Sequence, residues 1–126
     1  LKKLQGFYGA VIYLLDEIRK TYDKPIIIHC AFAQKGHSPK SQHYLGKAVD
    51  FHFKDSDYVA QYDLLKSYDI IGGLGFYGRT WNNRGWHIDL RPNRLYWMCD
   101  RSGGYIYGES TLENEVHKVM RCANGC

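Results

Sequence analysis

Hydrophobic residues recur at steps of three and four along the start of the chain. They are Leu4, Phe7, Tyr8, Val11, Leu14, Leu15 and Ile18. This spacing lines them up along one face of an α-helix of about five turns. Because Pro25 follows, we expect the helix to end between Thr21 and Asp23.

Shorter runs follow in which every second residue is apolar, which is the period of a β-strand. "PIIIHC" is a β-branched run after a proline and predicts a buried strand. "AVDFHF" and "GWHIDL" alternate apolar or small residues with polar ones and predict two more strands. "IIGGLGFYG" predicts a glycine-broken strand or a turn. "RLYWMCD" and "YIYGES" predict a β-hairpin in which Tyr96 and Trp97 are structural.

Two further helical patterns and one long aperiodic stretch complete the predicted elements. "DSDYVAQYDLLKSY" predicts a helix with Asp55 or Ser56 as its N-cap, and "STLENEVHKVMR" predicts a helix capped by Ser110 or Thr111. "AFAQKGHSPKSQHYLGK" shows no period and predicts a long loop, a feature that is usually functional or disordered in a compact domain. The order of the elements predicts an α+β fold with a mainly antiparallel sheet.

The composition favours a single domain that covers residues 1–126. Hydrophobic residues make up 44% of the 126 positions, which is enough for a folded core. The net charge of +4 is mild and no block of like charges occurs, so we expect no nucleic acid partner. No stretch approaches the roughly 20 apolar residues that cross a bilayer, so we expect no membrane span. We also expect the chain to act as a monomer.

Four ionisable residues stand at alternating positions of two predicted strands. In "AVDFHF", Asp50 and His52 project from one side of the strand, and in "GWHIDL", His87 and Asp89 likewise share a side. If the two strands pair, all four side chains lie close together on one face of the sheet. Burying carboxylates and imidazoles without partners is costly, and a divalent cation would offset that cost.

His43 supplies a third possible metal ligand from the end of the long loop. It precedes Asp50 by seven residues, and Gly46 permits the tight turn that would bring it back over the strand. His43, Asp50 and His87 would then give two nitrogens and one oxygen, which is the ligand set of a catalytic zinc with one position left for water. The spacing alone also fits structural histidines and an aspartate cap, so it leaves both interpretations open.

The motif "SQHYLGKAVDF" fits the pattern S-x-H-x-x-G-x-A-x-D, and "GWHIDLR" follows it about forty residues later. Together these motifs resemble the zinc D-Ala-D-Ala carboxypeptidase family, which includes bacterial wall-trimming enzymes and phage endolysin peptidases. The hedgehog signalling domain shares the same zinc fold. The resemblance covers about residues 4 to 97. It implies a small α+β sheet with helices packed on one face, of the hedgehog and D,D-peptidase type.

The resemblance also implies roles for individual residues. It implies that His43, Asp50 and His87 bind one Zn²⁺, that peptidoglycan stem peptides are the substrate, and that Ser41 lies near the substrate. Many members carry an acidic general base three residues before the last histidine, where this chain has Arg84. Asp89 is then the candidate base; its alternative role is to orient His87 or to pair with Arg91.

Three more residues are candidates for contact with the substrate. His52 is a candidate to polarise the carbonyl or stabilise the oxyanion, and its alternative role is a hydrogen bond to Asp50. Tyr77 and Trp81 flank the second motif and are candidates for the walls of a groove, whereas Trp86 points away from the metal and suits the core.

Family members also place an arginine for the substrate carboxylate just after the first core strand. This chain has "HCAFAQKGH" there and no arginine. Lys35 or Lys40 would offer a point charge without the two-pronged contact of arginine. The missing arginine favours cleavage of an internal peptide bond, as by an endolysin, over removal of a terminal D-Ala.

These observations predict a zinc peptidase that acts on stem peptides of peptidoglycan. One alternative is a zinc-containing domain of the same fold that binds without catalysis, which Arg84 at the usual acidic position favours. Another is a metal-free domain that binds sugars or the cell wall through the 11 tyrosines. The location depends on the owner: periplasmic or extracellular for a bacterial enzyme, and cytoplasmic before release for a phage endolysin.

Overall fold

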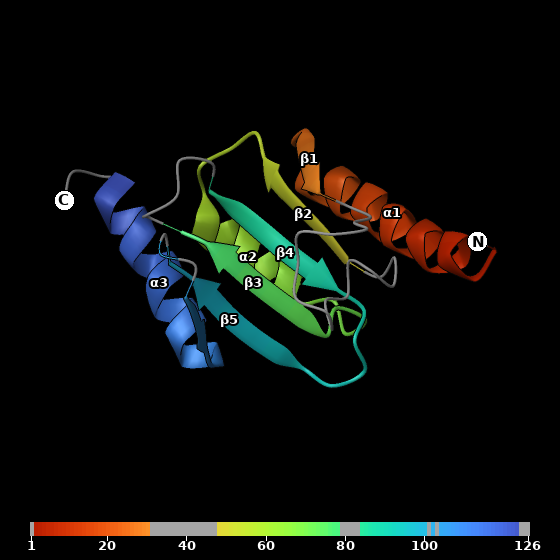
Figure 1. Cartoon of the computed structure of the whole chain (residues 1–126). Coiled ribbons are helices and arrows are strands. Elements are labelled where there is room, and N and C mark those ends of the chain that lie inside the picture. The colour runs from red at the N-terminus through yellow and green to blue at the C-terminus, as the bar shows by residue number, and fades with distance from the viewer. Residues whose placement is uncertain (1, 31–47, 79–83, 101, 103, 124–126) are drawn as a thin grey trace.

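The computed structural model describes residues 2–30, 48–78, 84–100, 102 and 104–123. In this part of the chain the elements run α1 (Lys2–Tyr22), β1 (Ile26–Cys30), β2 (Ala48–Phe53), α2 (Tyr58–Lys66), β3 (Gly73–Tyr77), β4 (Gly85–Asp89), β5 (Leu95–Cys99), β6 (Tyr105–Tyr107) and α3 (Glu109–Ala123). The described elements confirm the predicted α+β class (Figure 1). No described helix has the length and apolar character needed to span a membrane.

The six described strands form one sheet in the order β1-β2-β4-β3-β5-β6. The prediction of a mainly antiparallel sheet was wrong, because the sheet is mixed: β3 and β5 run parallel. Both edges of β4 are occupied, one by β2 and the other by β3. The next strand, β5, therefore pairs with the remaining edge of β3 and runs parallel to it. The predicted hairpin of β5 and β6 is confirmed, with Trp97 opposite Tyr107.

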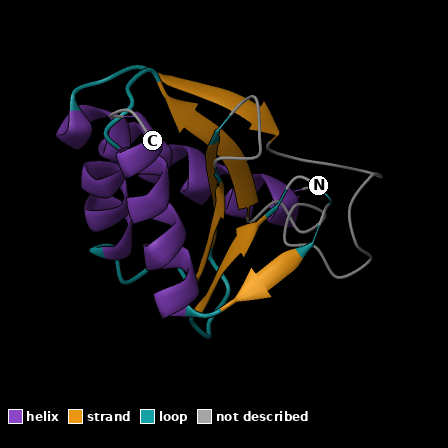
Figure 2. Ribbon diagram, turned by 90° about the vertical axis from the view of Figure 1, so that its left-hand side faces the viewer, coloured by secondary structure: helices purple, strands orange, loops and turns teal. Residues whose placement is uncertain are grey.

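One face of this sheet forms the hydrophobic core. Figure 2 shows α2 and α3 on one side of the strands. The strand residues that face the core are Val49, Phe51, Phe53, Leu74, Phe76, Trp86 and Ile88, and all are almost fully buried. They pack against Val11, Leu14, Leu15 and Ile18 of α1 and against Leu112, Val116 and Val119 of α3. The steps of three and four in both helices place these residues on one helical face.

Trp86 is the largest side chain that is fully buried in this core. Its ring lies 4.4 Å from that of Phe76, between centroids, and its indole N–H donates to the side-chain oxygen of Gln61 at 2.8 Å. This hydrogen bond satisfies two buried polar groups at once, which would otherwise destabilise the core. The interpretation of Trp86 as a core residue is therefore confirmed.

The end of α1 agrees with the prediction, whereas the cap of α2 lies one or two residues later than predicted. α1 ends at Tyr22, as expected, and Asp23 takes a φ of 60°. The N-cap of α2 is Asp57, whose carboxylate accepts from the amide of Ala60 at 3.0 Å. The predicted caps Asp55 and Ser56 were both wrong, since Asp57 caps the helix and the carboxylate of Asp55 accepts a hydrogen bond from the hydroxyl of Tyr22.

α3 begins earlier than its predicted caps. The helix starts at Glu109, so Ser110 and Thr111 lie inside its first turn. Gly108 precedes the helix with a φ of 131°, a conformation that side chains rarely adopt. The turn from β6 into the helix is therefore built on glycine rather than on a hydroxyl cap.

Candidate functional site

A row of side chains crosses the face of the sheet that lies opposite the core. Asp50 of β2 pairs with His87 of β4, His87 pairs with Gly75 of β3, and Gly75 pairs with Trp97 of β5. Residues that are directly opposite each other in a sheet project to the same side. The condition set by the sequence, that "AVDFHF" pairs with "GWHIDL", is thus met. We call this face, on which Asp50 and His87 lie, the polar face.

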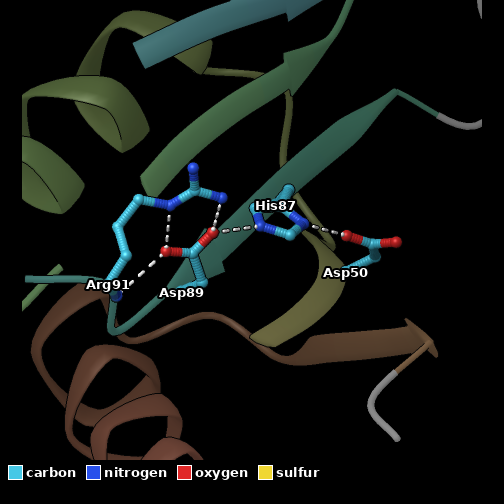
Figure 3. A network of polar contacts seen from close by, with 4 residues as sticks. All are labelled: Asp50, His87, Asp89 and Arg91. Atoms are coloured by element: carbon cyan, nitrogen blue, oxygen red, sulfur yellow. Dashed lines mark hydrogen bonds and ion pairs between the residues drawn. The ribbon is translucent and has the colours of Figure 1, made fainter. Parts of the chain in front are cut away.

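Asp50 and His87 make direct contact on the polar face. The Nδ1 atom of His87 lies 2.9 Å from Oδ1 of Asp50 (Figure 3). The side chain of His87 is 7% exposed and that of Asp50 is 15% exposed. A carboxylate oxygen and an imidazole nitrogen are thus aimed at each other from adjacent strands in a nearly buried position. Zinc binds both carboxylate oxygens and imidazole nitrogens as ligands.

Asp89 contacts the other ring nitrogen of His87. Its Oδ2 atom lies 2.7 Å from Nε2 of His87. Arg91 donates to both oxygens of Asp89, from Nε at 2.8 Å and from Nη2 at 2.7 Å, and its backbone N–H donates to Oδ1 at 3.1 Å. Figure 3 shows the four side chains in one chain of contacts: Arg91, Asp89, His87, Asp50. Because both oxygens of Asp89 have partners, the geometry favours its alternative role, which is to orient His87 and pair with Arg91.

The pKa values in this network follow from burial and from the partners. Burial would lower the pKa of His87, but hydrogen bonds to Asp50 and Asp89 outweigh burial and raise it. Burial would raise the pKa of Asp89, but hydrogen bonds from His87 and Arg91 outweigh burial and hold it well below its ordinary value. Asp89 therefore stays ionised at neutral pH and can accept a hydrogen bond from a protonated Nε2 of His87.

Two glycines of β3 make room for this network. A methyl group at Gly73 would fall 2.2 Å from Oδ2 of Asp89, and one at Gly75 would fall 2.4 Å from Nε1 of Trp97. Any side chain at Gly73 would displace Asp89 of β4, and any side chain at Gly75 would displace Trp97 of β5. The sequence pattern predicts only a broken strand or a turn at these glycines. The signal in the sequence was an apolar strand pattern interrupted at alternate positions.

Trp97 also belongs to this face, although the sequence suggested only a structural role in the hairpin. Its ring centroid lies 5.0 Å from that of His87, and the guanidinium of Arg91 lies 5.2 Å from the ring. Its side chain is buried, and its indole N–H has no hydrogen-bond partner within the described part of the chain. Trp97 thus packs against both His87 and the arginine that holds Asp89.

The remaining predicted residues divide into two groups. Ser41, His43 and Trp81 lie outside the described residues. His52 contacts His29 of β1, between Nδ1 and Nε2. Tyr77 ends β3 opposite Gly85 and Cys99 and is partly buried on the polar face.

The described residues supply part of the ligand set that a zinc ion needs. Within residues 2–30, 48–78, 84–100, 102 and 104–123, no group of three or more His, Cys, Asp and Glu side chains is arranged to hold a metal. Asp50 and His87 nevertheless fit two of the three expected ligands. They supply an oxygen and a nitrogen at one point, and Asp89 orients the imidazole as metal-ligating histidines require.

Comparison with protein families gives one match. The family model described as Peptidase M15 matches residues 5–89 of the chain. The match runs from α1 to the end of β4 and so includes Asp50, His87 and Asp89. Searches of the curated proteins and of the solved structures return no match.

Proposed function

The chain belongs to the Peptidase M15 family, and from this premise we propose that it is a zinc-dependent peptidase that hydrolyses stem peptides of bacterial peptidoglycan. The contact between Asp50 and His87, with Asp89 behind the imidazole, carries the proposal. His43, Asp50 and His87 would hold one Zn²⁺. The mixed sheet with its polar face opposite the helices supports a hedgehog-type zinc fold.

The bound zinc would supply a water of lowered pKa and a polarised substrate carbonyl. The protein's part is to keep two ligands in place. Asp89 fixes the ring of His87 and its tautomer, and Arg91 fixes Asp89 through a two-pronged contact. We therefore assign Asp89 and Arg91 as positioning residues that act through His87.

His52 is our candidate for the group that contacts the reacting carbonyl. It lies two residues from Asp50 on the same strand and projects to the same face. An imidazole there can donate a hydrogen bond to the developing oxyanion or carry a proton. This proposal leaves Tyr77, Ser41 and Trp81 as candidate contacts to the peptide on either side.

An internal bond of the stem peptide is the cleavage site that we favour. Arg91 is already bonded to both oxygens of Asp89, so it does not replace the arginine with which other members bind a terminal carboxylate. A substrate without a free carboxylate next to the cleaved bond needs no such group. We therefore expect endopeptidase activity to exceed carboxypeptidase activity.

One observation favours a second candidate function. Arg84 occupies the position at which many members of the zinc D-Ala-D-Ala carboxypeptidase family carry an acidic general base. A domain that binds zinc and a wall peptide without cleaving it would need no base. This candidate predicts zinc binding and peptide binding with no turnover on any stem peptide.

Mass spectrometry of muropeptides separates the two candidates. The protein is incubated with a peptidoglycan digest, with added zinc or with a chelator. We expect cleaved stem peptides with zinc, and none with the chelator or in Asp50→Ala. Asp100→Ala is the matched control, because that carboxylate caps the loop before β6 and bonds Ser102 and Gly104. Intact muropeptides in every sample that contains zinc would contradict the peptidase.

A further inference from the structure

A second pair of imidazoles lies at the β1 edge of the sheet. His29 of β1 and His52 of β2 are in direct contact through Nε2 and Nδ1. Their ring centroids are 4.6 Å apart and the ring planes differ by 30°. His29 is exposed and His52 is partly exposed, so the pair is accessible from solution.

A β-bulge brings the two rings together. Ile27 pairs with His52 and Ile28 with Phe51, but the next pair is Cys30 with Asp50, so the register shifts between Ile28 and Cys30. His29 is the extra residue on β1. A bulge redirects the side chain of the extra residue, and bulges are common beside functional sites. The ring of His29 contacts that of His52 on the neighbouring strand, although the backbone pairing assigns Ile27 to His52.

Two imidazole nitrogens that share a hydrogen bond across adjacent strands can serve as a ligand pair for a transition metal, which takes the place of the shared proton. Imidazole binds Zn²⁺, Ni²⁺ and Cu²⁺ well and hard cations such as Ca²⁺ poorly. Because both histidines stand on strands, little backbone ordering accompanies binding. The pair lies apart from the Asp50 and His87 contact, since His52 is two residues, roughly 7 Å, further along β2 than Asp50.

We propose that His29 and His52 bind a second divalent transition-metal ion, whose remaining positions are filled by water. This site has two protein ligands where the first has three, so it binds more weakly. Its affinity follows the usual order for such ligands, with Cu²⁺ above Ni²⁺ and Zn²⁺. The proposal concerns metal binding alone and does not depend on peptidase activity.

If the proposed function holds, a metal ion bound to His29 and His52 should slow peptide hydrolysis. A cation on the pair engages the Nδ1 of His52 and brings a positive charge beside the face on which the peptide would lie. Hydrolysis should then fall at metal concentrations above those that fill the first site. This consequence rests on the proposed function, whereas the binding measurement below does not.

Equilibrium dialysis against increasing free Zn²⁺, with metal analysis of the protein, tests the second site. We expect the wild-type chain to take up one equivalent first and a second at higher zinc. In His29→Ala the affinity of the second equivalent should fall at least tenfold while the first is unchanged. In Asp50→Ala the tight equivalent should be lost and the weak one kept. His117→Ala, which removes an exposed histidine of α3, should keep both equivalents.

Two results would overturn the proposal. One is a wild-type chain that binds a single equivalent up to about 1 mM free zinc, with that equivalent lost in Asp50→Ala. The other is a second equivalent that persists unchanged in both His29→Ala and His29→Gln. Urea unfolding of each variant establishes that it is folded, which we expect because His29 is exposed on an edge strand.

Discussion

The two faces of the sheet are made from alternate residues of the same strands, yet they are built on different principles. In β4, Trp86 and Ile88 face the core with no exposed surface, while His87 and Asp89 face the other way. The core face gains its stability from apolar burial and tight packing. On the polar face, each buried charge instead has a specific partner, from Arg91 through Asp89 and His87 to Asp50.

This difference shows that hydrophobic burial contributes little to the stability of the polar face. Asp89 is as fully buried as Ile88, although one is a carboxylate. It is accommodated because Arg91 and His87 occupy both of its oxygens and because Gly73 leaves space beside it. We therefore expect substitutions on the core face to change stability first, and substitutions on the polar face to change metal binding first.

The largest expected effect on stability comes from Trp86→Ala. It removes the largest fully buried side chain of the core face and leaves the side-chain oxygen of Gln61 without the indole donor. We expect the free energy of unfolding to fall by about 3–5 kcal/mol, as measured by urea denaturation. Tyr107→Ala is the control, since this tyrosine is 58% exposed and its loss should change stability by about 0.5 kcal/mol or less. Equal effects of the two substitutions would contradict the distinction between the faces.

A pair of glycine substitutions tests the space on the polar face. The methyl group of Gly73→Ala would overlap the carboxylate of Asp89, so we expect a loss of stability of about 1–3 kcal/mol and weaker zinc binding. Gly9→Ala places its methyl group in open space within α1 and should raise stability by about 0.5–1 kcal/mol. Thermal unfolding and zinc titration of both variants give the comparison. Stabilisation by both substitutions would show that Asp89 is not confined by Gly73.

The next effect in size is that of Asp89→Asn on zinc affinity. The amide keeps the shape of the side chain but weakens its hold on both His87 and Arg91. We expect zinc affinity to fall about 10- to 100-fold with the fold retained, because Asp89 orients a ligand without being one. Asp100→Asn, also a hydrogen-bonded carboxylate, should bind zinc like the wild type. Unchanged zinc affinity in Asp89→Asn would remove its positioning role.

The same residue gives a pH dependence of stability. Asp89 has a pKa below its ordinary value of 3.8 in the folded chain. Its contribution to stability is therefore full above pH 3.8 and is lost as the pH falls through the lower, folded value. We expect urea denaturation to show a steeper acid loss of stability in the wild type than in Asp89→Asn. Parallel pH profiles for the two proteins would contradict this assignment.

The smallest expected effect is that of the cap of α2, which lies away from both faces. Asp57→Ala removes the acceptor for the amide of Ala60 and should lower stability by about 1 kcal/mol. Asp63→Ala, an exposed position of the same helix, should change stability by less than about 0.5 kcal/mol. Zinc binding should be unaffected in both variants, which would separate stability from the metal ligands.

The sequence predicted the alternation of the strands and hence the sharing of faces, because a period of two is a local property. It left open whether "AVDFHF" and "GWHIDL" pair, and the structure shows that they do, with Asp50 in contact with His87. It did not predict that β5 would run parallel to β3, since this depends on which strand edges are already occupied.

The parts of the site that the sequence did not predict depend on neighbours across strands. The space at Gly73 and Gly75 has meaning only once Asp89 and Trp97 are known to lie beside them. The contact of His29 with His52 depends on a β-bulge that the pattern of "PIIIHC" does not predict. Proximity in the sequence favours Asp89 as the base, and only the positions of Arg91 and His87 show that both of its oxygens have partners.

X-ray data collected at the zinc absorption edge, from crystals grown with zinc, show whether Asp50 and His87 bind the ion. We expect a strong anomalous peak on the polar face, in contact with the carboxylate of Asp50 and with Nδ1 of His87, while Nε2 of His87 stays bonded to Asp89. An absence of anomalous density there, with Nδ1 of His87 still hydrogen-bonded to Asp50, would contradict this expectation.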